Sequence, residues 1–184
     1  MTDPGYLTEL EIVLKHDWRY AAYQKIQGRL FHRTTCLGLR GIVRSGEIRP
    51  NDGSFPFSFP RSETSYGFRN AYISLFDFEH TSVSDQIRTF VIWNNLIGQV
   101  SRVFFLLLLD SSELRPHLIS SCLAPQPGQP NYGGCMRPIE CWHPRPIELK
   151  CVTEVIVVSY VGPQPEIFTR AISMATEILD CYCP

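Results

Sequence analysis

Residues 30–35 read Leu-Phe-His-Arg-Thr-Thr, an apolar pair followed by a histidine, an arginine and two hydroxyl side chains. Apolar residues then recur between 37 and 43 at the spacing of one helix face, and Ser45-Gly46 is a typical signal for the end of a helix. The stretch predicts a strand over 29–32 and a helix over 37–44. Polar side chains are thus presented at a strand end, where a small ligand can reach them.

Three further segments have the character of strands. Residues 71–76 are rich in aromatic and β-branched side chains, which are enriched in strands. Residues 103–109 and 154–160 are almost continuously apolar, as expected of strands that are covered on both faces. These segments predict a sheet with 103–109 at its centre.

Helices are predicted in four other parts of the chain, one of them a short helix that Asp110 opens and Pro116 ends. Residues 7–27 have an apolar spacing that drifts between helix and strand, and we interpret them as one or two helical pieces. A second helix is predicted from Ser82 or Ser84 to Gly98, and a third over 168–179. Strands and helices in this order predict an α+β fold.

The long polar segment at 51–70 contains phenylalanines and prolines, and it is predicted to be a loop. Such a loop is equally compatible with a lid over a site and with a surface excursion held down by its aromatic side chains. Turn residues also dominate 125–134, and 136–147 is predicted to be a strand region interrupted by prolines.

Length and composition predict one globular domain over 1–184, with an N-terminal helical extension at 1–28. The net charge of −1 gives no general basic excess, although a local basic groove stays possible. No apolar run reaches the roughly 18 residues of a membrane span, and no secretory signal is evident at the N-terminus. We therefore expect a cytoplasmic protein without a membrane partner. Seven cysteines without a Cys-x-x-Cys pair predict neither a disulfide framework nor a metal site.

A second informative stretch, residues 137–149, reads Arg-Pro-Ile-Glu-Cys-Trp-His-Pro-Arg-Pro-Ile-Glu-Leu. Glu140 stands in a strand-like run, ahead of a proline-rich turn and the apolar strand at 154–160. Glu148 and Glu154 compete with it as functional carboxylates, but Glu148 follows a turn and Glu154 starts a buried strand. Glu140 is the preferred candidate.

Taken in order, three motifs resemble those of ADP-ribosyltransferases, the family of poly- and mono-ADP-ribosylating enzymes. They are His-Arg-Thr at 32–34, Tyr-Ile-Ser-Leu at 72–75, and Glu140 with its sequel of proline, apolar residue and strand. The last motif is most similar to the DNA-modifying DarT-type toxins. The resemblance implies a split antiparallel β-sheet core with flanking helices. It also implies NAD as a substrate, with transfer of ADP-ribose to a macromolecular acceptor.

The resemblance implies roles for the individual residues. His32 would bond the adenosine-side ribose, and Thr34 would help seat the nicotinamide end. Tyr72 would stack on the nicotinamide ring, with Ser74 beside it. Glu140 would be catalytic.

The arginines are harder to assign. Arg33 or Arg69 would contact the pyrophosphate, because a guanidinium pairs with two phosphate oxygens at once. DarT-like enzymes use an arginine between the first two motifs, for which Arg61 and Arg69 are both available; Arg69 is preferred as the second catalytic residue because it lies nearer the strand.

The chemistry independently favours a carboxylate. Cleavage of the bond between nicotinamide and ribose builds positive charge on the ribose, as in glycoside hydrolysis. A carboxylate facing that charge stabilises the transition state and can accept a proton from the acceptor. The absence of a Gly-x-Gly-x-x-Gly motif argues against a Rossmann-type cofactor site.

Other functions stay open on the same pocket. One is an NAD glycohydrolase or an RNA 2'-phosphotransferase, the latter with Arg33, Arg40 and Arg69 converging on a phosphate. Another is a catalytically inactive module that binds NAD or a nucleotide. The acceptor, and whether the protein is a toxin, is not apparent from the residues.

Overall fold

The computed structural model describes residues 10–13, 23–54, 62–83, 85–86, 103–126, 135–136 and 138–159. The strands are β1 (Leu10–Val13), β2 (Leu30–Thr34), β3 (Glu47–Ile48), β4 (Ile73–Asp77), β5 (Val103–Leu109), β6 (Ile119–Ser120), β7 (Glu140–His143), β8 (Ile147–Glu148) and β9 (Val152–Ser159). The α-helices are α2 (Cys36–Ser45), α3 (Tyr66–Arg69) and α5 (Ser111–Leu114), and short 3-10 helices span Ser62–Thr64, Arg115–His117, Ser121–Leu123 and Leu149–Cys151.

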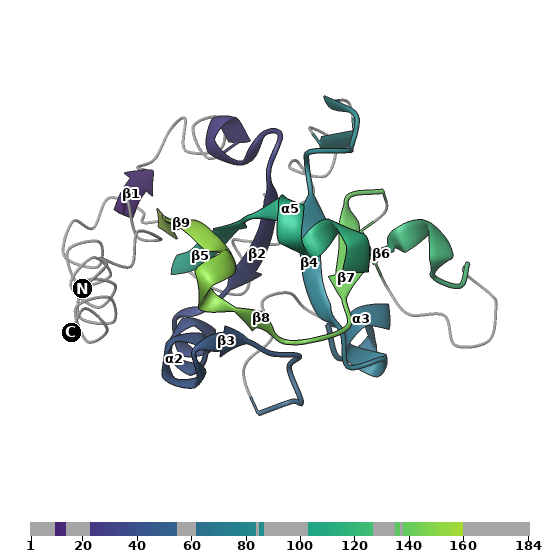
Figure 1. Ribbon diagram of the computed structural model, residues 1–184, viewed down its shortest axis with the longest axis horizontal. Helices are drawn as coiled ribbons and strands as arrows, with labels where there is room; N and C mark the ends of the chain where they lie inside the picture. Colours follow the sequence, from purple (N-terminus) through teal and green to yellow (C-terminus); the bar gives the residue numbers. More distant parts are fainter. Residues whose placement is uncertain are drawn as a thin grey trace.

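The strands form one large sheet and one small sheet (Figure 1). The large sheet has seven strands in the order β1-β9-β5-β2-β4-β7-β6, and β3 pairs with β8 in the small sheet. Strand β1 runs parallel to β9, and the other pairings are antiparallel. The predicted α+β class is therefore confirmed.

Strand β5 lies between β9 and β2, and its side chains are buried on both faces of the sheet. Phe105, Leu107 and Leu109 belong to one apolar cluster, which also contains the inner residues of α2. The alternate residues Phe104, Leu106 and Leu108 belong to a second cluster on the opposite face. The predicted central position of this apolar run is confirmed.

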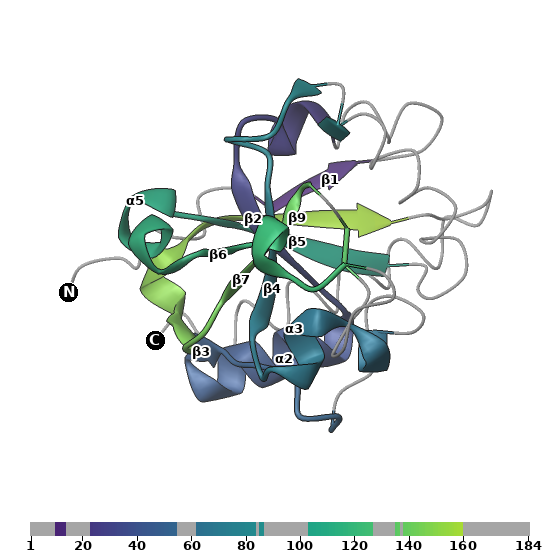
Figure 2. The same ribbon diagram turned by 90° about the vertical axis from the view of Figure 1, so that its right-hand side faces the viewer.

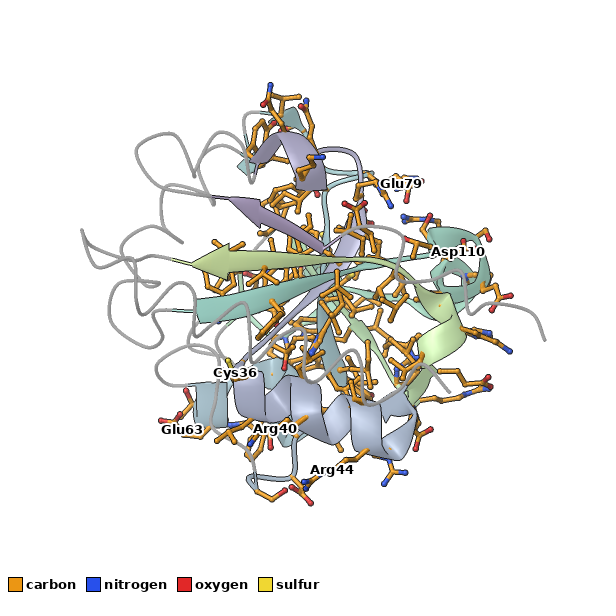
Figure 3. The ribbon with its side chains drawn as sticks, turned by 90° about the vertical axis from the view of Figure 1, so that its left-hand side faces the viewer. Cys36, Arg40, Arg44, Glu63, Glu79 and Asp110 are labelled. Carbon is orange, nitrogen blue, oxygen red and sulfur yellow. The ribbon has the colours of Figure 1, made fainter. Side chains whose placement is uncertain are left out.

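Helix α2 is fixed at both ends by local hydrogen bonds. The Gly38 N–H donates to Thr35 Oγ1 at the N-cap, and Gly46 ends the helix with a φ of 74°, a conformation that glycine adopts without steric cost. Leu39 and its inner neighbours are buried, while Arg40 and Arg44 lie on the outer surface of the helix (Figure 3). The helix predicted over 37–44 is confirmed.

The two faces of the large sheet are covered by different elements. Helix α2 lies on one side, and the helical turn at residues 23–26 lies on the other (Figure 2). Tyr23 and Ile26 from this turn join the apolar cluster opposite α2. Among the described residues, no helix has the length and apolar character needed to cross a membrane.

The prediction of helix over 7–27 is wrong at Leu10–Val13, which form strand β1. These residues pair with 155–158 of β9, so a buried apolar partner overrides the ambiguous local spacing. The predicted loop at 51–70 contains a 3-10 turn at Ser62–Thr64 and helix α3, which starts where the Phe68 N–H donates to the Ser65 hydroxyl. The predicted helices up to Gly98 and over 168–179 lie mostly or entirely outside the described residues.

Candidate functional site

His32 lies where β2 and β4 separate. The two strands pair at Leu30 and Phe31. Beyond that point the His32 ring bridges them, with its Nδ1 2.9 Å from the Ser74 carbonyl oxygen. A carbonyl oxygen only accepts, so Nδ1 carries the proton and Nε2 is the acceptor of the neutral ring. Burial lowers the pKa of His32, the bond to Ser74 raises it, and Arg33 lowers it, with a net decrease. The ring is therefore neutral at physiological pH.

Arg33 and Thr34 project to opposite faces of β2. The Arg33 guanidinium lies 4.5 Å from the centre of the Phe104 ring, in the cluster opposite α2, and only 3% of the residue is exposed. Burial lowers the pKa of Arg33 to about 9. Thr34 is buried beneath Gly38 of α2, where even a methyl group added to the glycine would collide with the threonine side chain. The three motif residues of β2 do not face one cleft.

Glu140 is held firmly at the start of β7. Only 6% of the residue is exposed. The Met136 N–H donates to Oε2 over 2.7 Å, the Trp142 Nε1–H donates to Oε1 over 3.0 Å, and the Ser74 side chain adds a further hydrogen bond. Burial raises the pKa of Glu140, and the bonds from Met136, Ser74 and Trp142 lower it, with a net increase. The three donors are neutral groups, so none of them cancels the charge of the carboxylate.

Three aromatic rings pack together beside Glu140, and one of them, Trp142, donates a hydrogen bond to its carboxylate. The Tyr66 ring lies 4.7 Å from the Trp142 ring and 6.3 Å from the Tyr72 ring, measured between centroids. Helix α3 approaches closely because residue 67 is glycine: a Cβ there would lie 2.7 Å from Ser74 Oγ and 2.8 Å from the Trp142 ring. Of the predicted site residues, His32 bonds to the Ser74 carbonyl group, and the Ser74 side chain bonds to Glu140. Tyr72 is linked to Glu140 through Tyr66 and Trp142.

The predicted arginines are not brought together. Arg69 is exposed at the end of α3, and Arg61 lies outside the described residues. Arg40 is exposed on α2, which covers the face of the sheet opposite the buried Arg33 guanidinium. Arg33 and Arg40 therefore cannot converge on one phosphate in this arrangement, which argues against the phosphotransferase alternative.

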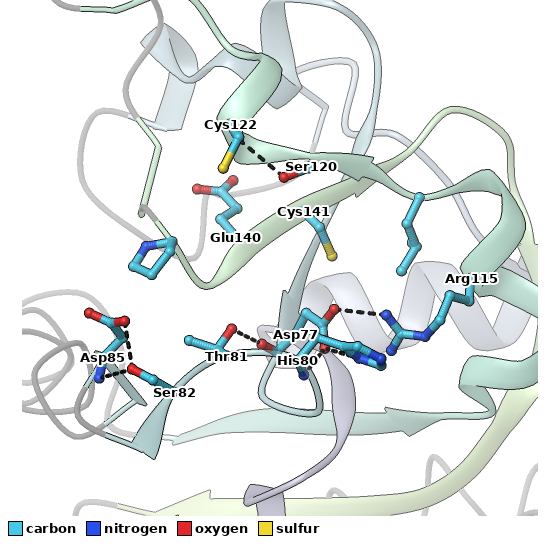
Figure 4. Close-up of a pocket in the computed structure, with 12 residues that line it drawn as sticks. Asp77, His80, Thr81, Ser82, Asp85, Arg115, Ser120, Cys122, Glu140 and Cys141 are labelled. Atoms are coloured by element: carbon cyan, nitrogen blue, oxygen red, sulfur yellow. Dashed lines mark hydrogen bonds and ion pairs between the residues drawn. The ribbon is translucent and has the colours of Figure 1, made fainter.

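A pocket of about 410 Å³ opens beside Glu140 (Figure 4). Figure 4 shows Glu140 next to Cys122 on one wall, with Ser82 and Asp85 on the facing wall. Among the described residues, those that line the pocket are Asp77, His80, Thr81, Ser82, Asp85, Arg115, Leu118, Ser120, Cys122, Pro138, Glu140 and Cys141. Glu140 is the only residue of the predicted site among them.

An ion-pair network supports one side of this pocket. Arg115 Nη1 lies 3.0 Å from Asp77 Oδ2, and Nη2 lies 2.5 Å from Glu79 Oε2. Burial raises the pKa of Asp77, but the bonds from Arg115 and His80 outweigh it and hold the pKa below its usual value. Arg115 thereby ties the loop after β4 to the 3-10 helix at Arg115–His117.

Ligand atoms of Asp77, Glu79 and His80 lie within 4.8 Å of one another. Both carboxylates already pair with Arg115, so a cation binding there would have to displace the guanidinium.

The pocket residues were missed because no local pattern marks them. The sequence predicts Ser82 only as a possible start of a helix, and no motif includes Asp77 or Thr81. Arg115 lies 38 residues further along the chain, and its ion pair with Asp77 depends on how the sheet brings the two loops together. The polar residues 79–82, which closely follow the predicted strand, are the one available signal.

Comparisons with known proteins add no relatives: no family model, curated protein or solved structure matches this chain.

Proposed function

We propose that this protein is an NAD-dependent mono-ADP-ribosyltransferase that releases nicotinamide and transfers ADP-ribose to a macromolecule. The observation that carries the proposal is the Glu140 carboxylate, buried, fixed by neutral donors and lining a pocket. A carboxylate placed in this way is suited to face the positive charge that develops on the ribose. It also accepts the proton that the incoming acceptor gives up.

The surrounding residues fit this chemistry. The His32 Nδ1–H donates to the Ser74 carbonyl oxygen, so Nε2 of the neutral ring can accept a hydrogen bond from a ribose hydroxyl. Tyr72 and Tyr66 supply aromatic surface for the nicotinamide ring. Ser74 positions the carboxylate through its hydrogen bond to Glu140. Arg33 stays a predicted contact of the pyrophosphate. Its guanidinium is stacked on Phe104, which makes it less accessible to a ligand.

The proposal is tested by incubating the protein with NAD and cell lysate and measuring free nicotinamide by chromatography. NAD labelled in the adenosine moiety then shows whether the label enters DNA, RNA or protein. Glu140→Gln removes the charge at nearly constant shape and should reduce release by at least about a hundredfold, a typical loss when a general base is removed.

Glu148→Gln is the matched control, because Glu148 is exposed on β8 and pairs with Lys150 at 3.1 Å. This variant should release nicotinamide as the wild type does. Equal release by the Glu140 variant would refute the assignment. Absence of release together with absence of NAD binding by calorimetry would refute the proposed function, whereas binding without release would identify an inactive NAD-binding module.

A further inference from the structure

Two histidines lie side by side near the edge of the large sheet that β6 forms. His143 is the last residue of β7, and His117 is the last residue of the 3-10 helix that precedes β6. Strand β6 is antiparallel to β7, and its register brings the two histidines together. Their ring centroids are 6.0 Å apart, and the ring planes are inclined by 79°. Neither histidine belongs to the predicted NAD site or to the described lining of the pocket.

The Nε2 atom of His143 is a buried acceptor without a partner. Only 4% of the residue is exposed. Its Nδ1 lies 2.7 Å from the Arg145 carbonyl oxygen, which only accepts, so Nδ1 carries the proton and Nε2 of the neutral ring carries a lone pair. Among the described residues, this Nε2 has no hydrogen-bond partner. Buried polar atoms normally have one, so the unpaired lone pair indicates a group that binds to it.

The geometry of the pair fits a shared metal ion. A histidine that donates Nδ1–H to a backbone carbonyl group and keeps Nε2 for coordination has the arrangement typical of metal ligands. Two imidazoles on one zinc ion, with Zn–N bonds of about 2.0–2.1 Å, place their ring centres about 5–6.5 Å apart. The observed 6.0 Å lies in this range. A direct hydrogen bond between two ring nitrogens would instead bring the centres to within about 5.5 Å.

The surroundings allow an ion to enter and choose its kind. His117 is exposed, so an ion reaches the pair from solvent. Nitrogen ligands suit zinc, whereas magnesium and calcium require oxygen ligands. Of the two guanidinium groups nearest in sequence, that of Arg115 pairs with the carboxylates of Asp77 and Glu79, and Arg145 is exposed.

We propose that His117 and His143 bind a zinc ion, with His143 coordinating through Nε2 and water completing the coordination shell. The ion joins β7 to the 3-10 helix that contains His117. Arg115 anchors the same helix to the loop after β4, so both ends of this short helix are tied to neighbouring elements. The inference does not depend on the proposed transferase activity.

Binding is measured by calorimetry, with zinc chloride titrated into the reduced protein after metal has been removed by a chelator. His117→Ala changes an exposed side chain and should weaken binding at least about tenfold, as should His143→Gln if circular dichroism shows that it folds. His80→Ala is the matched control, because His80 is an exposed histidine in the group with Asp77 and Glu79. This variant should bind zinc as the wild type does, and magnesium chloride should not bind to any of them.

Two further measurements identify the ligands. Co²⁺ in place of zinc should give a visible spectrum without a sulfur-to-metal charge-transfer band, because both protein ligands are nitrogen atoms; this matters in a chain with seven cysteines. Zinc at about a hundredfold excess over its Kd should raise the Tm by about 5–10 °C in the wild type and in His80→Ala. The shift should be absent in His117→Ala.

The outcomes are decisive for the pair. Zinc binding that is unchanged in His117→Ala, or that is lost in His80→Ala, would overturn the proposal. A sulfur-to-cobalt band that persists in His117→Ala would also overturn it, because cysteines would then hold the metal. Loss of binding and of the Tm shift in His117→Ala, with both retained in His80→Ala, supports the site whether or not nicotinamide is released.

Discussion

The hydrogen bond from Trp142 to Glu140 allows a quantitative test of how the site is built. Trp142→Phe keeps a buried aromatic ring but removes the Nε1–H that donates to Glu140 Oε1 at 3.0 Å. Trp142 is fully buried, so the smaller ring also leaves unfilled space. The substitution therefore has a packing cost and an electrostatic cost, and only the second depends on the charge of Glu140.

The two costs differ in size and in pH dependence. A change of buried aromatic shape costs about 1–2 kcal/mol, less than the 3–5 kcal/mol of truncation to alanine. A hydrogen bond to a charged group contributes about 1.5–3 kcal/mol, against about 1 kcal/mol for a neutral one. We expect a total loss of about 3–4 kcal/mol where Glu140 is ionised. The loss should be about 1 kcal/mol smaller where Glu140 is protonated.

The direction of this pH dependence follows from the raised pKa of Glu140. A carboxyl group whose pKa is higher in the folded state favours folding most when it is protonated, and this contribution is lost as the pH rises through the folded-state pKa. Trp142→Phe removes a donor to the ionised form and therefore raises the pKa of Glu140 further. The stability difference between variant and wild type should therefore widen with increasing pH.

The measurement is urea unfolding followed by tryptophan fluorescence and circular dichroism, from about pH 4.5 to about pH 8. A double-mutant cycle with Glu140→Gln is the control, because the pH-dependent part of the Trp142 effect should disappear once the carboxyl group is gone. A stability loss that stays the same across this pH range, within about 0.3 kcal/mol, would refute the view that the indole N–H holds an ionised carboxylate.

Other substitutions test the elements around the site. Thr35→Ala removes the N-cap of α2 and should lower the free energy of unfolding by about 1 kcal/mol, whereas Thr35→Ser should retain most of it, as measured by thermal denaturation. Gly67→Ala places a methyl group against the Trp142 ring and should lower the free energy of unfolding by about 1–3 kcal/mol in the same assay. Arg115→Gln removes the ion pairs with Asp77 and Glu79. Because the pKa of both carboxyl groups is lowered in the fold, this variant should lose stability at neutral pH and approach the wild type once acid protonates them, as urea unfolding at both pH values would show.

Local patterns were sufficient to predict the central sheet and α2. The apolar run of β5 has the length and composition that are typical of a strand covered on both faces. The Thr35 cap and Gly46 are signals that act within one turn of the helix they delimit. By contrast, Leu10–Val13 gain their strand conformation from β9, about 145 residues away in the chain, so their own spacing could not reveal it.

The candidate site likewise has a part that could be predicted from local sequence and a part that could not. Glu140 and Ser74 lie on adjacent strands in the register that pairs Ser74 with Trp142, and they meet as a sheet built from those two motifs requires. The resemblance assigns all three residues of the β2 motif to one site, although successive side chains of a strand point to opposite faces of the sheet. His32 and Arg33 must therefore face opposite sides of the sheet, and Phe104 provides the apolar and aromatic surface that buries Arg33.

The acidic pocket could not be predicted, because it is made by loops that meet only after the sheet has formed. The net charge of −1 gives no indication of this pocket. Its described lining combines the carboxylates of Asp77, Asp85 and Glu140 with the guanidinium of Arg115. Arg115 reaches Asp77 only because the sheet places β4 next to the segment that follows α5, and no periodicity within either segment reveals that ion pair.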